Sequence, residues 1–222
     1  MTEAAARRVV PNAFTVSLDD VGLTQLPSVG GKGANLGEMR RARFPVPEGF
    51  VVTVDAYLSA LDASAMRART RKLFAETDVD DAESLREHSR ALQAVIEAMP
   101  MPRTLTDQIA AQYQSLGAEC RVAVRSSATS EDTAGCSFAG MHETLTNVRG
   151  EAELLSAIKR CWMSLWNERV LAYRKSRELT EEPALAVVVQ RMVDADFAGV
   201  MFTADPTAND RERVVIEAAF GL

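Results

Sequence analysis

The sequence has few cysteines and histidines and no long apolar run. It contains three cysteines and two histidines, with neither a CxxC pair nor a Cys/His spacing typical of a metal site. No apolar stretch approaches the roughly 18 residues that can cross a bilayer, and the N-terminus lacks the apolar core of a secretory signal. We therefore expect a cytoplasmic protein with reduced thiols, no membrane partner and no metal ligands within this chain.

Positive charge is scarce as well. Lys and Arg together number 25 against 31 Asp and Glu, which gives a formal net charge of −6. A broad nucleic-acid surface needs a basic face, so nucleic acid is not an expected partner, although a local basic pocket for phosphates is compatible with this balance. Hydrophobic residues make up 47% of the chain, which is typical of globular proteins and enough for a buried core without disulfides.

Two kinds of hydrophobic periodicity alternate along the chain and predict a mixed α+β fold. Short alternating or continuous apolar segments predict strands at residues 14–18, 50–54, 121–126, 143–148, 185–189, 198–203 and 213–218. Apolar residues at spacings of three and four predict helices at 34–43, 55–65, 83–98, 104–115 and, as one long helix, 151–178.

The segment Gly30-Gly31-Lys32-Gly33 precedes the first predicted helix. Glycines let a backbone approach an anion closely, a helix N-terminus adds positive potential, and a lysine adds a charge. The segment matches neither GxxxxGK[ST] nor GxGxxG, because Gly33 follows the lysine and Gly37 comes one residue late. Two interpretations stay open at this point: a phosphate-binding turn, or a solvated glycine turn of the common kind.

A second candidate is Arg125, which stands near the end of a predicted strand and is followed by Ser126-Ser127-Ala128-Thr129. A guanidinium can hold two phosphate oxygens in a bidentate fork. The loop-like stretch 126–140, rich in small and hydroxylated residues, is typical of a flap that closes over phosphates. The alternative is an ordinary surface loop, because loops favour the same residues.

A third candidate is the strand exit Val187 to Val193, which carries Gln190 and Met192. Its backbone groups could meet the edge of an adenine ring while Met192 packs on the ring. The alternative is a core strand that simply ends at the surface. Trp162 and Trp166 favour a core position on the long helix, because they recur at helical spacing with other apolar residues.

The three candidate segments and two further ones form an ordered series of five along the chain. They are SVGGKGANLGEM, FPVPEGFVVT, VAVRSSATSEDTAGCSFAGMHETLTNV, VVVQRMVDADFAGVMFTADP and VIEAAFGL. Together they resemble the N-terminal nucleotide-binding domain of the pyruvate-phosphate dikinase and phosphoenolpyruvate synthase family, which rifampin phosphotransferases share. The resemblance runs from about Ser17 to Leu222. It implies an α+β fold of the ATP-grasp type with two lobes: a leader at 1–13, an N-terminal lobe at 14–120, and a second, incomplete nucleotide-binding segment at 121–222.

The resemblance also implies roles for single residues. Lys32 matches the family lysine that contacts the ATP phosphates, and Arg125 matches the arginine on the transferred phosphates, so these two are the expected catalytic residues. The other matches are expected to bind the nucleotide: Gly31 and Gly33 in the glycine segment, Gly140 and Thr144 near the phosphates, Gln190 and Met192 beside adenine, and Glu217 on the nucleotide side.

Other parts of the family are not found in this sequence. The family's Mg²⁺-binding glutamate and glutamine are expected beyond residue 222, and neither His88 nor His142 has the context of the family's phosphorylated histidine. The resemblance therefore implies an ATP- and Mg²⁺-dependent phosphotransferase portion that is truncated at its C-terminal end and catalytically incomplete by itself. Its phosphohistidine and substrate domains are expected in cis or in trans.

Three functions are compatible with these residues. The chain could be the ATP-binding part of a dikinase that passes a phosphate to a carrier histidine and on to pyruvate, the same part of an enzyme that phosphorylates an antibiotic, or a stand-alone nucleotide sensor. The form FAGMHET, where the synthases and rifampin enzymes commonly have FAGQQ, leaves the subfamily open. We expect the dikinase role, because the phosphate-contacting residue types are all present.

Overall fold

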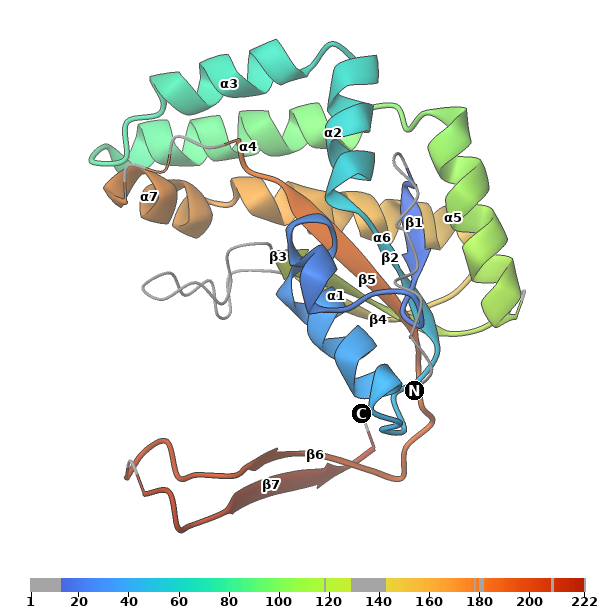
Figure 1. The fold of residues 1–222 in the computed structure, drawn as a ribbon. Coiled ribbons are helices and arrows are strands. Elements are labelled where there is room, and N and C mark those ends of the chain that lie inside the picture. Colours follow the sequence, from blue (N-terminus) through green and yellow to red (C-terminus); the bar gives the residue numbers. More distant parts are fainter. Residues whose placement is uncertain are drawn as a thin grey trace. The chain divides into compact units, whose positions relative to one another are not determined.

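The computed structural model describes residues 13–117, 119–128, 143–177, 179, 182–208 and 210–221, and Figure 1 shows it as a ribbon. The chain forms two compact units that divide between Met192 and Val193. The boundary predicted at residue 120 falls instead inside the first unit, because one sheet takes strands from both sides of it. The predicted leader lies, apart from Ala13, outside the described residues.

The first unit is built on a five-stranded sheet in which every neighbouring pair is antiparallel. Its order is β1 (Thr15–Ser17), β2 (Gly49–Val52), β5 (Leu185–Arg191), β3 (Val122–Ala128) and β4 (Thr144–Val148). Strand β5 is central and almost wholly buried, which explains its continuous apolar sequence LAVVV, because both of its faces meet core side chains.

One face of this sheet carries the main hydrophobic core. On this face α2 (Val54–Ala63), α5 (Arg103–Leu116) and α6 (Glu151–Met163) contact the strands, and α4 (Ala82–Ala98) packs on α6 and completes the core. Trp162 and Trp166 lie in this core as predicted, and the Trp166 indole N–H donates to the hydroxyl of Tyr57 at 3.1 Å. This bond satisfies two polar atoms that burial would otherwise strip of water.

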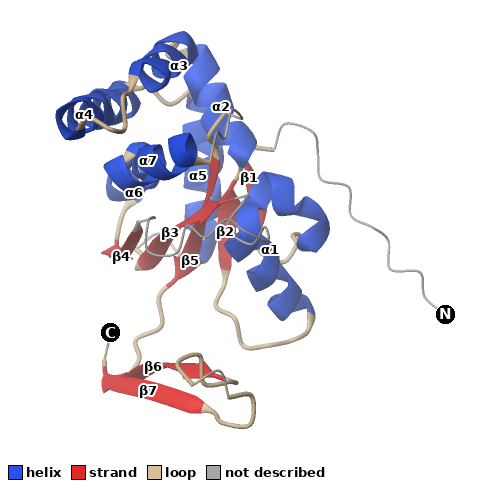
Figure 2. Ribbon diagram, turned by 90° about the vertical axis from the view of Figure 1, so that its left-hand side faces the viewer, coloured by secondary structure: helices blue, strands red, loops and turns tan. Residues whose placement is uncertain are grey.

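The other face of the sheet is covered by α1 (Leu26–Arg41), so that the sheet lies between α1 and the helices of the main core (Figure 2). A smaller cluster fills this side, with Val29 and Ala34 of α1 packed on Val51, Ala186 and Val188 of the strands. Because paired residues of neighbouring strands point to the same face, this cluster identifies which strand residues point toward α1.

Two helical predictions differ from the structure. The expected helix 151–178 is three segments: α6, a 3-10 turn η2 (Ser164–Trp166) and α7 (Glu168–Ser176). The break occurs at Asn167, whose side chain accepts a hydrogen bond from Val170 N at 2.8 Å and so caps a new helix. Helix α3 (Arg67–Glu76) was not predicted; its residue Thr70 is buried, and it packs on α4 rather than on the sheet.

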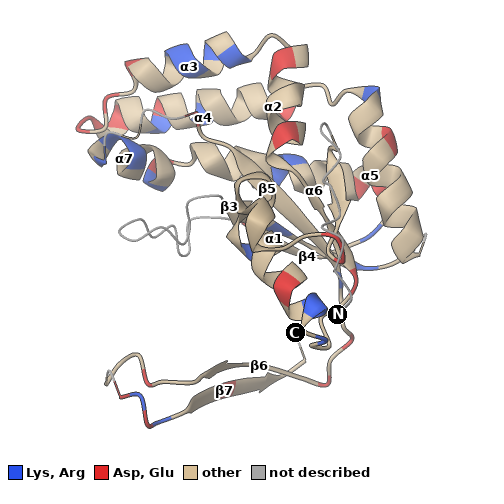
Figure 3. Cartoon of the chain, in the orientation of Figure 1, with Lys and Arg blue, Asp and Glu red and all other residues tan. Residues whose placement is uncertain are grey.

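Charged residues follow this layering. In Figure 3 the strands of the five-stranded sheet carry few of them, whereas α3, α4 and α7 carry many.

A short 3-10 turn, η1 (Leu23–Gln25), leads into α1. Among the described residues, no helix is both long and apolar enough to cross a membrane.

The second unit is a two-stranded antiparallel hairpin of β6 (Phe197–Phe202) and β7 (Val215–Phe220). Both strands had been predicted within two residues of these bounds. The hairpin exposes several large apolar side chains, namely Phe197, Val200, Met201, Phe202, Ile216 and Phe220.

Candidate functional site

The glycine segment predicted as a turn is a kink within α1. Gly30 has φ 70° and ψ 170°, while the residues on both sides are helical. This combination of dihedrals is essentially restricted to glycine. A second helical stretch therefore begins at Gly31, and Lys32 lies half-buried in its first turn. Amide groups in the first turn of a helix lack partners within that helix, which makes such a position suitable for an anion.

The kink is fastened to the end of β3 by Ser127. The Ser127 hydroxyl donates to Val29 O at 2.8 Å and accepts from Gly33 N at 3.1 Å. Contact is also close at Gly30, where a Cβ atom would lie 2.2 Å from the Ser127 carbonyl oxygen. The structure thus joins the glycine segment and the VRSSA segment, which are 94 residues apart at the Gly33–Ser127 bond. Because the Gly33 N–H is used in this bond, it is not available to a ligand.

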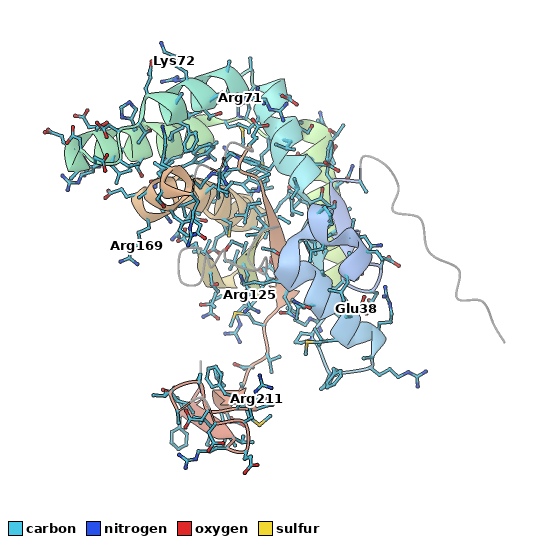
Figure 4. All side chains as sticks on the ribbon, turned by 60° about the vertical axis from the view of Figure 1, so that its left-hand side comes forward. Glu38, Arg71, Lys72, Arg125, Arg169 and Arg211 are labelled. Carbon is cyan, nitrogen blue, oxygen red and sulfur yellow. The ribbon has the colours of Figure 1, made fainter. Side chains whose placement is uncertain are left out.

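Arg125 lies two residues before Ser127 on the same strand. Its partner residues are Val188 on β5 and Thr144 on β4. Val188 belongs to the cluster beneath α1, so the Arg125 side chain emerges on the α1 side of the sheet. Figure 4 labels Arg125 within this part of the molecule. The same geometry places Lys32 and Arg125 on the two elements that Ser127 ties together.

The Arg125 guanidinium makes no ion pair with a carboxylate in the described part of the chain. Its Nε atom is buried and has no hydrogen-bond partner there. The Nε atom of Arg67 is likewise without a hydrogen bond, but Arg67 makes ion pairs with Asp62 and Glu182, whereas no described carboxylate pairs with Arg125. A buried cationic donor without a partner is costly, and an anionic oxygen would satisfy it.

The remaining predicted residues lie at different places. Thr144 is exposed beside Arg125 on β4. Gln190 lies on the α1 face, since it is two residues from Val188, and its side-chain amide donates to Pro47 O at 3.2 Å. Met192 Sδ accepts from Asn147 N at 2.9 Å, which joins the exit of β5 to β4.

Two predicted residues lie outside the described part of the first unit. Glu217 is an exposed residue of β7, paired with Val200, in the second unit. Gly140 lies outside the described residues, as does His142. His88 is on α4, where its Nδ1 atom is 2.8 Å from Ser84 O.

The donor set fits phosphate oxygens rather than a metal ion. Among the residues that the structure describes, no group of three or more His, Cys, Asp or Glu side chains could hold a metal. The described side chains at the junction are instead an arginine, a lysine and hydroxyl groups. Cationic and N–H donors of this type recognise phosphate.

The sequence pattern pointed to Arg125 and Lys32 as candidates but indicated no separate role for Ser127. The sequence signal was weak, because Ser126 and Ser127 are adjacent and chemically identical. Strand alternation separates them: Ser126 points to the other face, and its hydroxyl donates to Glu143 O at 3.2 Å.

Comparison with known proteins places these segments in context. Residues 26–222 match the family model described as pyruvate phosphate dikinase, AMP/ATP-binding domain. The chain is 43% identical over 210 residues to a probable phosphoenolpyruvate synthase of Archaeoglobus fulgidus. The aligned region covers 92% of this chain and 28% of that relative. The phosphoenolpyruvate synthase of Aeropyrum pernix is 43% identical, and the alignment covers 92% of this chain and 26% of that relative. The phosphoenolpyruvate synthase of Pyrococcus furiosus is 36% identical, and the alignment covers 94% of this chain and 30% of that relative. The chain thus spans less than a third of these relatives' length.

Proposed function

Because the chain belongs to the family of the pyruvate phosphate dikinase AMP/ATP-binding domain, we propose that it binds ATP at the junction of α1 and β3, as the nucleotide-binding part of a phosphoenolpyruvate synthase-type phosphotransferase. The names of its relatives favour pyruvate over an antibiotic as the final acceptor. The wider arrangement proposed is a two-lobed ATP-grasp site in a cytoplasmic enzyme.

The observation that carries this proposal is the buried Nε atom of Arg125, which lies near the kink in α1 and has no hydrogen-bond partner among the described residues. In the proposed complex the Arg125 guanidinium binds phosphate oxygens and the Lys32 ammonium neutralises their charge from α1. Fixed positive charges stabilise a phosphoryl group as it is transferred, because they face the charge that develops on its oxygens. Gln190 and Met192 border the adenine, and Thr144 approaches the phosphates from β4.

The whole reaction needs groups beyond the described residues. We propose that an ATP phosphate passes to a carrier histidine on another domain and from there to pyruvate. Mg²⁺ would shield the phosphate charges in such a reaction, but the described residues offer no cluster to hold it. Within this chain the proposed contributions are therefore nucleotide binding and cationic stabilisation of the phosphates.

The test is a pair of calorimetric titrations, with ATP and with adenosine, on the wild-type chain and on Lys32→Met. Removing the ammonium should weaken ATP binding by roughly 10- to 100-fold, equivalent to about 1.5–3 kcal/mol for a charged hydrogen bond. Adenosine binding should stay within twofold, because adenosine lacks the phosphates.

A matched control is Lys72→Met. Lys72 is an exposed lysine of α3 that pairs with Glu76, and Figure 4 labels it at a distance from Arg125. Lys72→Met removes the same charge as Lys32→Met but leaves the junction of α1 and β3 unaltered, so ATP binding should be unchanged. Absence of ATP binding by the wild-type chain would overturn the proposal. Equal losses for ATP and adenosine in Lys32→Met would instead assign the lysine to folding or to the base pocket.

A further inference from the structure

We propose that Ser127 is a positioning residue, which holds the Gly30–Gly33 kink, and with it Lys32, in a fixed place relative to Arg125. The inference rests on the proposed ATP-binding function. It explains how two phosphate-binding cations from distant parts of the sequence are held at fixed positions relative to each other. Ser127 itself is not assigned any contact with the nucleotide.

The first argument is the arrangement of its hydrogen bonds. The Ser127 hydroxyl is fully buried and bonds to both sides of the kink, donating to Val29 O before it and accepting from Gly33 N after it. One side chain thereby spans the single non-helical residue of α1. A hydroxyl has one donor and two acceptor lone pairs, so both bonds form at once.

The second argument is that the Ser127 hydroxyl replaces a hydrogen bond that a straight helix would make. An uninterrupted α-helix would pair the Gly33 N–H with Val29 O directly, as an i to i−4 bond. At the kink the Ser127 hydroxyl stands between these same two atoms. The bridge therefore stabilises the kinked form of α1, in which Gly31 and Lys32 begin a new helical stretch.

The third argument is the position of Ser127 on β3. Arg125 and Ser127 are two positions apart and so point to the same face of the strand. Fixing Ser127 against the kink also fixes the distance from the kink to the root of the Arg125 side chain. A displacement of about 1 Å between groups that act together on one ligand is enough to weaken their combined action.

The neighbouring serine supplies the control. Ser126 is 2% exposed and Ser127 is 0% exposed, and each hydroxyl donates to a backbone carbonyl. The Ser127 hydroxyl bonds to α1, whereas the Ser126 hydroxyl bonds to Glu143 O next to β4. Replacing either serine by alanine removes the same atom from a buried site on the same strand, so a difference between the variants reports on the kink and not on burial in general.

The experiment compares wild type, Ser127→Ala and Ser126→Ala by two measurements. The first is amide hydrogen exchange at Gly33 by NMR, which should accelerate at least tenfold in Ser127→Ala and stay within twofold of wild type in Ser126→Ala. The second is titration with ATP and with adenosine. Ser127→Ala should bind ATP about tenfold more weakly while adenosine binding changes less than twofold. The reason is that the substitution disturbs only the relative position of Lys32 and Arg125, which bind the phosphates.

A second variant keeps the test decisive if Ser127→Ala does not fold. Ser127→Cys nearly conserves the volume but offers a weaker donor and acceptor, so it should show intermediate Gly33 exchange and intermediate ATP affinity. Wild-type affinity for ATP in both Ser127 variants would overturn the inference, as would an equal loss in Ser126→Ala or an equal loss for adenosine. If the wild-type chain bound no ATP, the proposed function would fall, and this inference with it. ATP binding that ignores Ser127 would refute the inference alone.

Discussion

The kink at Gly30 is the feature on which the proposed site depends, and it can be tested by Gly30→Ala. Two costs follow from the structure. An alanine held at φ 70° and ψ 170° occupies a sparsely populated region, at about 1–3 kcal/mol. Its Cβ would also lie 2.2 Å from the Ser127 carbonyl oxygen, and relieving such a collision in a packed core costs another 1–3 kcal/mol or so. We expect a total loss of about 2–6 kcal/mol.

Gly150 offers a control with nearly the same backbone. It has φ 84° and ψ 155°, and no atom lies within 4 Å of the place where its Cβ would be. Gly150→Ala therefore incurs the conformational cost of about 1–3 kcal/mol without the collision. Gly150 is also the N-cap of α6, a position that disfavours alanine, so this comparison underestimates the effect of the collision at Gly30.

The assay is equilibrium unfolding in urea followed by tryptophan fluorescence. Both tryptophans are buried in the first unit, so the signal reports on the unit that contains the kink. The free energy of unfolding should fall by at least about 1 kcal/mol more in Gly30→Ala than in Gly150→Ala, which is the lower end of the overpacking cost. Equal losses in the two variants would show that β3 does not press on the kink, and would refute the site geometry.

Two further predictions concern single side chains. Arg125→Met should weaken ATP binding roughly 10- to 100-fold by calorimetry while leaving the urea midpoint unchanged or higher, because it removes a guanidinium whose buried Nε has no partner among the described residues. A lower midpoint with unchanged ATP affinity would assign Arg125 to folding. Burial, aided by the negative charge of Glu143, raises the pKa of the Cys161 thiol to about 12, so mass spectrometry after iodoacetamide treatment at pH 8 should find Cys161 unmodified in the folded chain and alkylated in urea. The unfolded thiol loses its proton near pH 9, before the folded one, so the thiol should lower the free energy of unfolding between pH 9 and 12 by up to about 1.4 kcal/mol per pH unit. Cys161→Ala should remove this contribution and leave that of Tyr57, whose pKa burial also raises.

The family assignment was available from the sequence, and the comparisons confirm it. Local periodicity was also sufficient for most elements. The helices predicted at 83–98 and 104–115 agree within one residue with α4 and α5, because each has a regular apolar stripe and the prolines at 100 and 102 separate them. Strand β5 was evident from its run of β-branched residues, since only a strand buried on both faces has that composition.

Predictions failed where the local pattern was weak or where a neighbour decided the structure. Helix α3 was missed because half of its sequence RARTRKLFAE is charged, and its two large apolar residues, Leu73 and Phe74, are adjacent and form no stripe at helical spacing. The break after α6 was missed because apolar spacing continues through Asn167, whose capping bond is visible only in the folded chain. The predicted domain boundary at residue 120 falls inside the first unit, because strands from both sides of it pair in one sheet. Such pairing between distant segments cannot be predicted from either segment alone.

The same division applies to the site. The residue types were determined by the sequence: glycines around Lys32, an arginine ending an apolar strand, and two adjacent serines. Tertiary structure decided that the glycine segment is a one-residue kink, that β3 presses on it, and that Ser127 rather than Ser126 bridges it. The physical reason is strand alternation: a side chain's partners depend on which face of the sheet it occupies, and that face is set by strands and helices far away in the sequence.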